Sequence, residues 1–156
     1  MTQAVAKTAL TGCLAPIDKT GLDELIAKGK ADPKVIKTLK CKTVAEGRFR
    51  HLNFIRSLPA YVVDEPPGSG GTGSGPMPTE YLLAAMASCY ALALNWAAGK
   101  RGTTLPGLAV TATGTYDGPK FSRLQLTVSC DAPAEEVERL VEPALGRDHC
   151  AKILDH

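Results

Sequence analysis

The sequence of 156 residues has little charge bias and few aromatic residues. Its formal net charge is +2, and the basic residues are scattered rather than gathered in one block. Three Phe, four Tyr and one Trp offer few stacking platforms for single-stranded nucleic acid. We therefore expect no nucleic-acid partner.

Regular cysteine spacing is also missing. The five cysteines, at positions 13, 41, 89, 130 and 150, form no Cys-x-x-Cys pair, which excludes the common zinc-ribbon and thioredoxin motifs. No clean signal peptide is visible, because polar residues interrupt the apolar stretch of the N-terminus. We expect a cytoplasmic protein without a metal or cofactor, in which one or two thiols are functional and no disulfide framework exists.

The most apolar stretch runs from Pro78 to Ala98 and is rich in Ala and Leu. It predicts a helix, since these residues favour helix and Pro78 suits the first turn. Its apolar run, Tyr81 to Leu94, is shorter than the roughly 18–20 residues of a membrane span. We expect a buried central helix that carries Cys89 and ends near Gly99, and no membrane association.

The rest of the chain predicts an α+β domain with helices packed on antiparallel sheet. Before the central helix we expect a helix from Thr20 to Gly29 and a meander of three strands; after it we expect a hairpin around the turn Asp117-Gly118 and a last helix that follows Asp131. The expected strands are residues 38–46, 49–56, 61–64, 108–116 and 121–129. We expect residues 1–35 to form an N-terminal extension, partly helical, and residues 36–156 to form the domain.

Residues 64–78 connect the meander to the central helix, and nine of these fifteen residues are Gly or Pro. The composition is typical of a flexible linker. The alternative is an ordered loop laid across an active site. A position inside one small domain favours the ordered loop.

Two cysteines have a context that suggests chemistry. Cys89 lies in the middle of the central helix, where it is either an inert buried thiol or a nucleophile activated by a nearby cation. Cys150 follows His149 near the end of the chain and is either a helix-end thiol or a resolving thiol that meets Cys89. We expect Cys13, Cys41 and Cys130 to be structural.

The stretch VVDEPPGSGG…GPMPTEYLLAAMASC, followed later by HCAKIL, resembles the OsmC/Ohr family of osmotically inducible and organic hydroperoxide resistance proteins. The resemblance covers about Cys41 to Leu154. It implies an OsmC-like fold, with antiparallel sheets packed around a central buried helix that carries a Cys. It also implies an intertwined homodimer with sites at the interface.

The resemblance further implies a thiol peroxidase, with Cys89 as the peroxidatic thiol and Cys150 as the resolving thiol. The substrate is then an organic hydroperoxide, which apolar neighbours such as Leu82, Met86 and Tyr90 would favour. A dithiol of the lipoyl or thioredoxin type would reduce the resulting disulfide. A different class stays open, a non-catalytic binding or sulfur-handling module in which Cys89 is a buried structural thiol.

In this family an Arg of the first hairpin, in a Gly-Arg sequence, activates the thiol, and Gly47-Arg48 matches it. Arg50 and Arg56 are alternatives for this role. We expect substitution of Arg48 to slow the reaction strongly, and substitution of Arg50 or Arg56 to be nearly neutral.

Peroxidase members of the family also place a Glu ten residues before the reactive Cys. Here Thr79 occupies that position, and the acid is Glu80, one residue later. Nine helical residues at about 100° each turn Glu80 half a turn away from Cys89. We therefore expect Glu80 mainly to complement the helix N-terminus, with a smaller effect on catalysis than Arg48.

Overall fold

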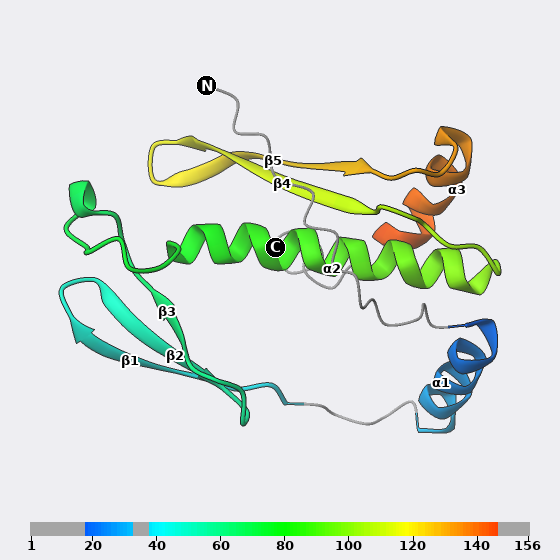
Figure 1. Ribbon diagram of the computed structural model, residues 1–156, viewed down its shortest axis with the longest axis horizontal. Coiled ribbons are helices and arrows are strands. Elements are labelled where there is room, and N and C mark those ends of the chain that lie inside the picture. Colours follow the sequence, from blue (N-terminus) through cyan, green and yellow to red (C-terminus); the bar gives the residue numbers. More distant parts are fainter. Residues whose placement is uncertain (1–17, 33–37, 147–156) are drawn as a thin grey trace.

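The computed structural model describes residues 18–32 and 38–146 of the protein. The elements are α1 (Lys19–Ala31), β1 (Cys41–Gly47), β2 (Arg50–Ile55), β3 (Tyr61–Val63), a single 3₁₀ turn η1 (Pro67–Ser69), α2 (Pro78–Lys100), β4 (Ala109–Asp117), β5 (Lys120–Ser129) and α3 (Ala134–Leu145). Strands β1, β2 and β3 form one antiparallel sheet, and β4 and β5 form a second. Figure 1 shows α2 lying between the two sheets. The α+β class and the order of elements expected from the sequence are confirmed.

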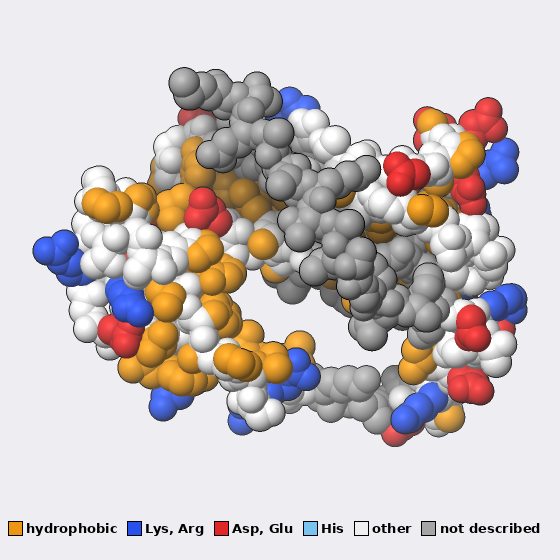
Figure 2. Space-filling model, in the orientation of Figure 1, with side chains coloured by type: hydrophobic (Ala, Val, Ile, Leu, Met, Phe, Trp, Pro, Cys, Tyr) orange, Lys and Arg blue, Asp and Glu red, His pale blue; other side chains and the backbone are white. Residues whose placement is uncertain are grey.

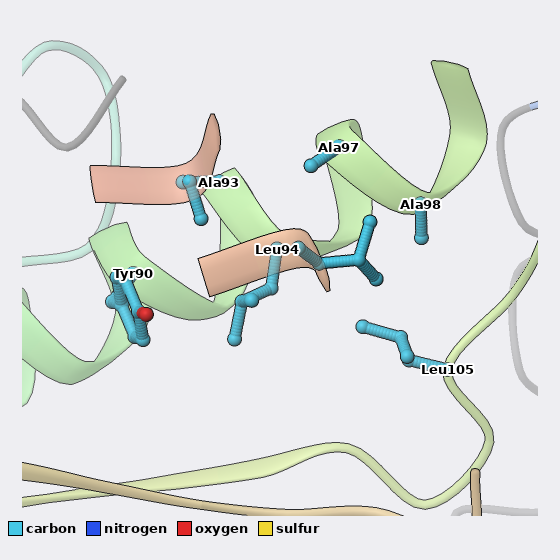
Figure 3. Packing of buried hydrophobic residues seen from close by; sticks show 8 residues of the cluster. Tyr90, Ala93, Leu94, Ala97, Ala98 and Leu105 are labelled. Carbon is cyan, nitrogen blue, oxygen red and sulfur yellow. The ribbon is translucent and has the colours of Figure 1, made fainter. Parts of the chain in front are cut away.

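The hydrophobic core lies on one side of α2, where the helix packs against α3 and β4. Leu94 has no exposed surface, and Tyr90 is buried in the same cluster. Leu105 completes the contact from the loop after α2 (Figure 3), and Leu140 of α3 belongs to the same cluster. Burial of one Leu side chain stabilises a fold by about 1.5–3 kcal/mol. This cluster therefore holds the C-terminal half of α2 in place.

The opposite side of α2 is uncovered in a single chain. Leu92 is 65% exposed and Leu82 is 38% exposed, and Ala85 is exposed on the same helix face. The prediction that this helix is buried all round is thus wrong for one chain. The reason is that α3 and β4 cover one side of the helix along its C-terminal half, whereas on the other side β3 contacts its first turn, where the Tyr81 hydroxyl donates to the Val62 carbonyl at 2.8 Å.

With 23 residues, α2 is long and apolar enough to meet the length and composition criteria of a membrane span. The sequence had suggested a shorter apolar run. Its buried residues, however, pack against α3 and β4. The helix is thus the core helix of a globular domain.

The ends of α2 are set by its flanking backbone. The helix begins at Pro78 as predicted, and the Glu80 carboxylate accepts a hydrogen bond from the Met77 backbone N–H at 2.8 Å. It ends at Lys100, and the left-handed residue that terminates it is Gly102, with φ +72°. Gly99, expected at the end, is instead buried inside the last turn. Only a glycine adopts such a φ at little cost, so the stop falls at Gly102.

Other boundaries differ from the prediction by a few residues. Helix α1 begins at Lys19, because the Asp18 side chain, and not Thr20, accepts the capping bond from the Gly21 N–H. It continues beyond Gly29 to Ala31. Helix α3 begins after Pro133 with Glu135 and Glu136 in its first turn, as expected for a helix that follows Asp131.

Helix α1 packs on α2, and its Leu22 is 1% exposed. The division into an extension of residues 1–35 and a domain of residues 36–156 stays a prediction. Leu22 is not part of the core cluster around Leu94, and Figure 1 shows α1 beside the C-terminal end of α2, on the side away from β4 and β5.

The β1–β2–β3 sheet exposes several large apolar side chains. They are Val44, Phe49, Phe54 and, just after β2, Leu58, each between 38% and 54% exposed. Figure 2 shows hydrophobic side chains gathered over this sheet and along the rim of the opening between the sheet and α2. Large exposed apolar patches are typical of interaction surfaces.

Candidate functional site

The Gly-rich segment between β3 and α2 is an ordered loop. Its backbone is tied by the bonds from Gly70 N to Pro67 O and from Gly71 N to Pro66 O, at 3.1 and 3.2 Å. A further bond joins Gly73 N to Glu65 O at 3.0 Å. The structure therefore agrees with the ordered-loop alternative and not with a flexible linker.

Asp64 stands at the start of this loop and has no exposed surface. Its Oδ2 accepts hydrogen bonds from the backbone N–H and the hydroxyl of both Thr72 and Ser74. Its Oδ1 accepts the Glu65 N–H at 2.9 Å. These bonds, above all that of the Thr72 hydroxyl, hold the pKa of the Asp64 carboxyl well below its usual range, although burial acts in the opposite direction.

Two glycines of the loop have a steric reason to be glycine. A Cβ at Gly71 would lie 1.8 Å from the Glu65 carbonyl oxygen, and Gly70 has φ +88°. A Cβ at Gly70 would also meet the Phe49 ring at 2.8 Å. Phe49 follows Arg48 in the turn between β1 and β2, so the loop lies directly against that turn.

Arg50 joins the same loop to the hairpin. Its Nε donates to the Ser74 hydroxyl at 3.1 Å, and its guanidinium forms an ion pair with Glu46 of β1 at 3.1 Å. Ser74 thus accepts from Arg50 while its own hydroxyl donates to Asp64. Arg50 is a fixed cation whose charge is already paired.

The other two candidate arginines lie at opposite ends of β2. Arg48 is exposed in the β1–β2 turn with φ +48°, and within residues 18–32 and 38–146 it forms no ion pair or hydrogen bond. Arg56 follows the other end of β2 and lines a cavity of about 800 Å³ together with Cys41. Of the three, Arg48 alone combines a position beside the Gly-rich loop with an uncommitted charge.

Glu80 lies in the first turn of α2, where its carboxylate caps the helix N-terminus. It also lines a cavity of about 370 Å³ between α2 and β4, together with Leu83, Ala87 and Val110. Cys89 does not line this cavity. The regular helix from Pro78 to Lys100 turns Glu80 away from Cys89, in agreement with the predicted helical phase.

Cys89 lies in the middle of α2 and is half-buried. Leu82 lies on its face of the helix, whereas Tyr90 belongs to the core cluster on the other side. The predicted apolar surroundings thus divide between two faces of α2. No hydrogen bond or ion pair joins Arg48, Glu80 and Cys89 within the described part of the chain, and Cys150, like Cys13, lies outside it.

Two further cysteines, Cys41 and Cys130, lie in the described part of the chain. Cys41 is exposed at the start of β1, with its Sγ 3.7 Å from Asn53 Oδ1. Burial raises the pKa of Tyr61, and the neighbouring Cys41 adds to this shift. Cys130 packs half-buried against the core. Within residues 18–32 and 38–146 no group of three or more His, Cys, Asp and Glu side chains gathers that could hold a metal ion.

The sequence interpretation missed the roles of Asp64, Thr72 and Ser74. One signal was present, because Asp side chains at loop starts commonly accept hydrogen bonds from nearby backbone N–H groups. Two hydroxyl residues in a Gly-rich loop were the matching donors. The sequence could not show that Thr72 and Ser74 are these donors, because an irregular loop has no repeat that predicts which residue, eight or ten positions on, returns to Asp64.

The Asp64 contacts predict a pH-dependent contribution to stability. Because the pKa of Asp64 is lower in the folded chain than its unfolded value of about 3.9, its contribution is present above that pH and is lost as the pH falls below it. We expect Asp64→Asn to lower the free energy of unfolding at pH 7, and the difference from wild type to shrink below about pH 4. Urea unfolding at several pH values measures both.

Asp117→Asn, exposed near the β4–β5 turn, is the matched control and should have little effect throughout. The wild type and Asp64→Asn could instead differ in free energy of unfolding by the same amount from pH 7 to pH 2.5. That result would contradict the assignment of a carboxylate held ionised in the loop.

Comparison with known proteins assigns the fold to one family. The family model described as OsmC-like protein matches residues 71–154, which is more than half of the chain. This match includes Cys89, Glu80 and residues 71–77 of the Gly-rich loop. Comparison with curated proteins gives no match.

Solved structures share the fold at low sequence identity. An OsmC-like protein from Mycoplasma pneumoniae is 17% identical, with a TM-score of 0.64 over 78% of this chain and 89% of that one. An organic hydroperoxide resistance protein OsmC from Legionella pneumophila is 18% identical, with a TM-score of 0.58 over 78% and 91%. An organic hydroperoxide resistance protein from Elizabethkingia anophelis is 19% identical, with a TM-score of 0.58 over 76% and 89%.

The family match and the shared fold agree with the resemblance seen in the sequence. Low identity to each solved structure marks a divergent member. The chain belongs to the OsmC-like protein family.

Proposed function

We propose that this protein is a thiol-dependent peroxidase that reduces organic hydroperoxides, with Cys89 as the peroxidatic residue. The observation that carries this proposal is the position of Cys89, half-buried in the middle of α2 near the uncovered face of the helix. The fold is shared with solved organic hydroperoxide resistance proteins, which supports the substrate class. No cofactor takes part in this chemistry.

The proposed reaction consumes one thiolate and one peroxide bond. The Cys89 thiolate attacks the distal oxygen of the hydroperoxide, the O–O bond breaks, and the alkoxide leaves and takes up a proton to form an alcohol. Cys89 is oxidised to a sulfenic acid. The Cys150 thiol then attacks this sulfur, water leaves, and a disulfide forms. An external dithiol of the lipoyl or thioredoxin type returns two electrons and two protons.

Arg48 is the proposed cation that stabilises the thiolate and the developing alkoxide. Its guanidinium is unpaired within residues 18–32 and 38–146, whereas Arg50 is committed to Glu46 and Ser74. Figure 1 shows the β1–β2 turn, to which Arg48 belongs, at the same end of the molecule as the N-terminus of α2. Cys89 lies roughly 16 Å from that N-terminus along the helix axis, at about 1.5 Å per residue. A second copy of the chain is therefore the proposed route by which an Arg48 approaches a Cys89.

A homodimer is supported by the surface that one chain leaves apolar. Leu82 and Leu92 of α2 are exposed, as are Val44 and Phe54 of the β1–β2–β3 sheet. Figure 2 shows hydrophobic side chains along the rim of an opening beside that sheet. Insertion of a second α2 would cover both surfaces and would place Cys89 at the interface.

The proposed site of action is the cytoplasm, where dithiol reductants are present, with neither a membrane nor a nucleic acid as partner. The alternative, a binding or sulfur-handling module, treats Cys89 as an inert structural thiol. Its position weighs against that alternative, because Cys89, unlike the equally half-buried Cys130, is not among the side chains packed against the core cluster.

Substitution of the proposed nucleophile gives the first test. We expect Cys89→Ser to abolish consumption of an organic hydroperoxide in the presence of a dithiol. Cys130→Ser, at an equally half-buried thiol, is the matched control and should keep the activity. After one equivalent of peroxide, mass spectrometry should show a Cys89–Cys150 bridge, which requires Cα atoms within about 7 Å. Full activity in Cys89→Ser would rule out the proposed nucleophile.

Arginine and glutamate substitutions test the activating group. We expect Arg48→Ala to lower the second-order rate with peroxide by roughly 10²-fold, because the developing anion loses its partner. Glu80→Ala should cost only a few-fold, as the helix-terminal contribution is about 0.3–1 kcal/mol. Arg56→Ala is the control at the other end of β2 and should be close to wild type. A larger loss for Arg56→Ala than for Arg48→Ala would move the role to Arg56.

The dimer is tested by a charge on the uncovered face of α2. We expect the wild type to sediment as a dimer, and Leu92→Asp to sediment as a monomer with little peroxidase activity, because a charge in an apolar interface is costly. Leu145→Asp on α3, at a residue 47% exposed, is the control and should stay dimeric. A wild-type protein that sediments as a monomer at micromolar concentration would refute the dimer.

A further inference from the structure

The Asp64 carboxylate is the most heavily hydrogen-bonded side chain of the described residues, and the peroxidase chemistry does not use it directly. Four donors converge on its Oδ2 and one on its Oδ1, and the side chain is completely buried. A buried charge is retained at such a place only with full hydrogen bonding. The positions of these donors show that the charge orders the Gly-rich loop.

The donors come from one stretch of the Gly-rich loop. Thr72 and Ser74 each contribute a backbone N–H and a hydroxyl. The Asp64 N–H also bonds to the Pro76 carbonyl at 3.1 Å, which closes the loop onto its own start. Glycine-rich chain loses much conformational entropy when it is ordered, so this convergence of charge-assisted bonds is the force that fixes the loop.

Two contacts connect this ordered loop to the β1–β2 turn. One is the bond from Arg50 Nε to the Ser74 hydroxyl, and Arg50 is in turn paired with Glu46. The other is the Phe49 ring, which packs against Gly70 so closely that a Cβ there would lie 2.8 Å from it. The two contacts hold Phe49 and Arg50, the two residues that follow Arg48. Arg48 itself has a left-handed backbone conformation, which persists only where the surrounding structure fixes the turn.

We propose that Asp64 is a positioning residue for Arg48, acting through Ser74 and Arg50 to fix the β1–β2 turn against the Gly-rich loop. This inference rests on the proposed role of Arg48 as the cation at the reactive thiol. It changes one expectation drawn from the sequence, namely that substitution of Arg50 is nearly neutral. Arg50 does not touch the reacting atoms, but it transmits the order of the loop to the turn.

The placement is measured without any peroxide. In ¹⁵N-labelled protein we expect the Arg50 Nε–H signal and the Thr72 and Ser74 amides to exchange slowly, and the Arg48 amide to be rigid in relaxation measurements. Ser74→Ala and Asp64→Asn should speed exchange at these positions and increase motion at Arg48. Ser74→Thr, which keeps a hydroxyl, should restore the wild-type signals. Ser69→Ala, in the same loop but without a side-chain bond among the described residues, is the control.

The consequence for reactivity is read from a double-mutant cycle. We expect Ser74→Ala and Asp64→Asn each to lower the rate of Cys89 oxidation about tenfold, since a misplaced group loses its contribution. Combined with Arg48→Ala, either change should cause no further loss, because all of its effect runs through Arg48. Ser74→Thr should recover the wild-type rate and Ser69→Ala should keep it.

The outcomes separate this inference from the proposed function. Losses that add fully to that of Arg48→Ala would show a general structural role for Asp64 and would overturn the inference, as would an Arg48 amide that stays rigid in both Ser74→Ala and Asp64→Asn. A wild type that consumes no peroxide would refute the proposed function, and the relaxation of Arg48 would then decide the positioning role by itself. Ser74→Ala keeps the test valid if Asp64→Asn does not fold.

Discussion

One-sided burial of α2 is the constraint on which the rest of the structure depends. The helix is apolar on every face, but α3, β4 and the loop after α2 cover only one side, around Leu94. Leu94 is completely buried, whereas Leu92, two residues earlier, is 65% exposed. The uncovered side, which lies next to Cys89, gives the domain its open shape and gives the homodimer proposal its physical basis.

The second organising interaction is electrostatic rather than hydrophobic. A single buried carboxylate, Asp64, orders a segment whose composition by itself would favour disorder. Within the described part of the chain its charge is stabilised by hydrogen-bond donors of the loop and not by a salt bridge. The same loop leads into Pro78 and so sets where the Cys helix begins. The thiol and the hairpin arginine therefore belong to elements joined by one ordered connection.

Much of the fold could be predicted from local patterns. The alternation of polar and apolar residues and the turn residues predicted the boundaries of every strand to within three residues. This worked because the strand period and the Asp117-Gly118 turn are local properties. The N-terminal cap at Asp18 and the stop at Gly102 were missed, since several residues nearby satisfy the same local rules. The Asp64 contacts were missed for a different reason, as they join residues eight and ten positions apart in a loop without periodicity.

The sequence by itself determined the α+β class, the central helix with Cys89, and the resemblance that the family match then confirmed. It also determined the helical phase that separates Glu80 from Cys89, because a regular helix fixes angle by residue number alone. Only the tertiary structure decided which side of α2 is buried and which hairpin arginine is already paired. Those facts depend on contacts between elements distant in sequence, and no local pattern of residues encodes such contacts.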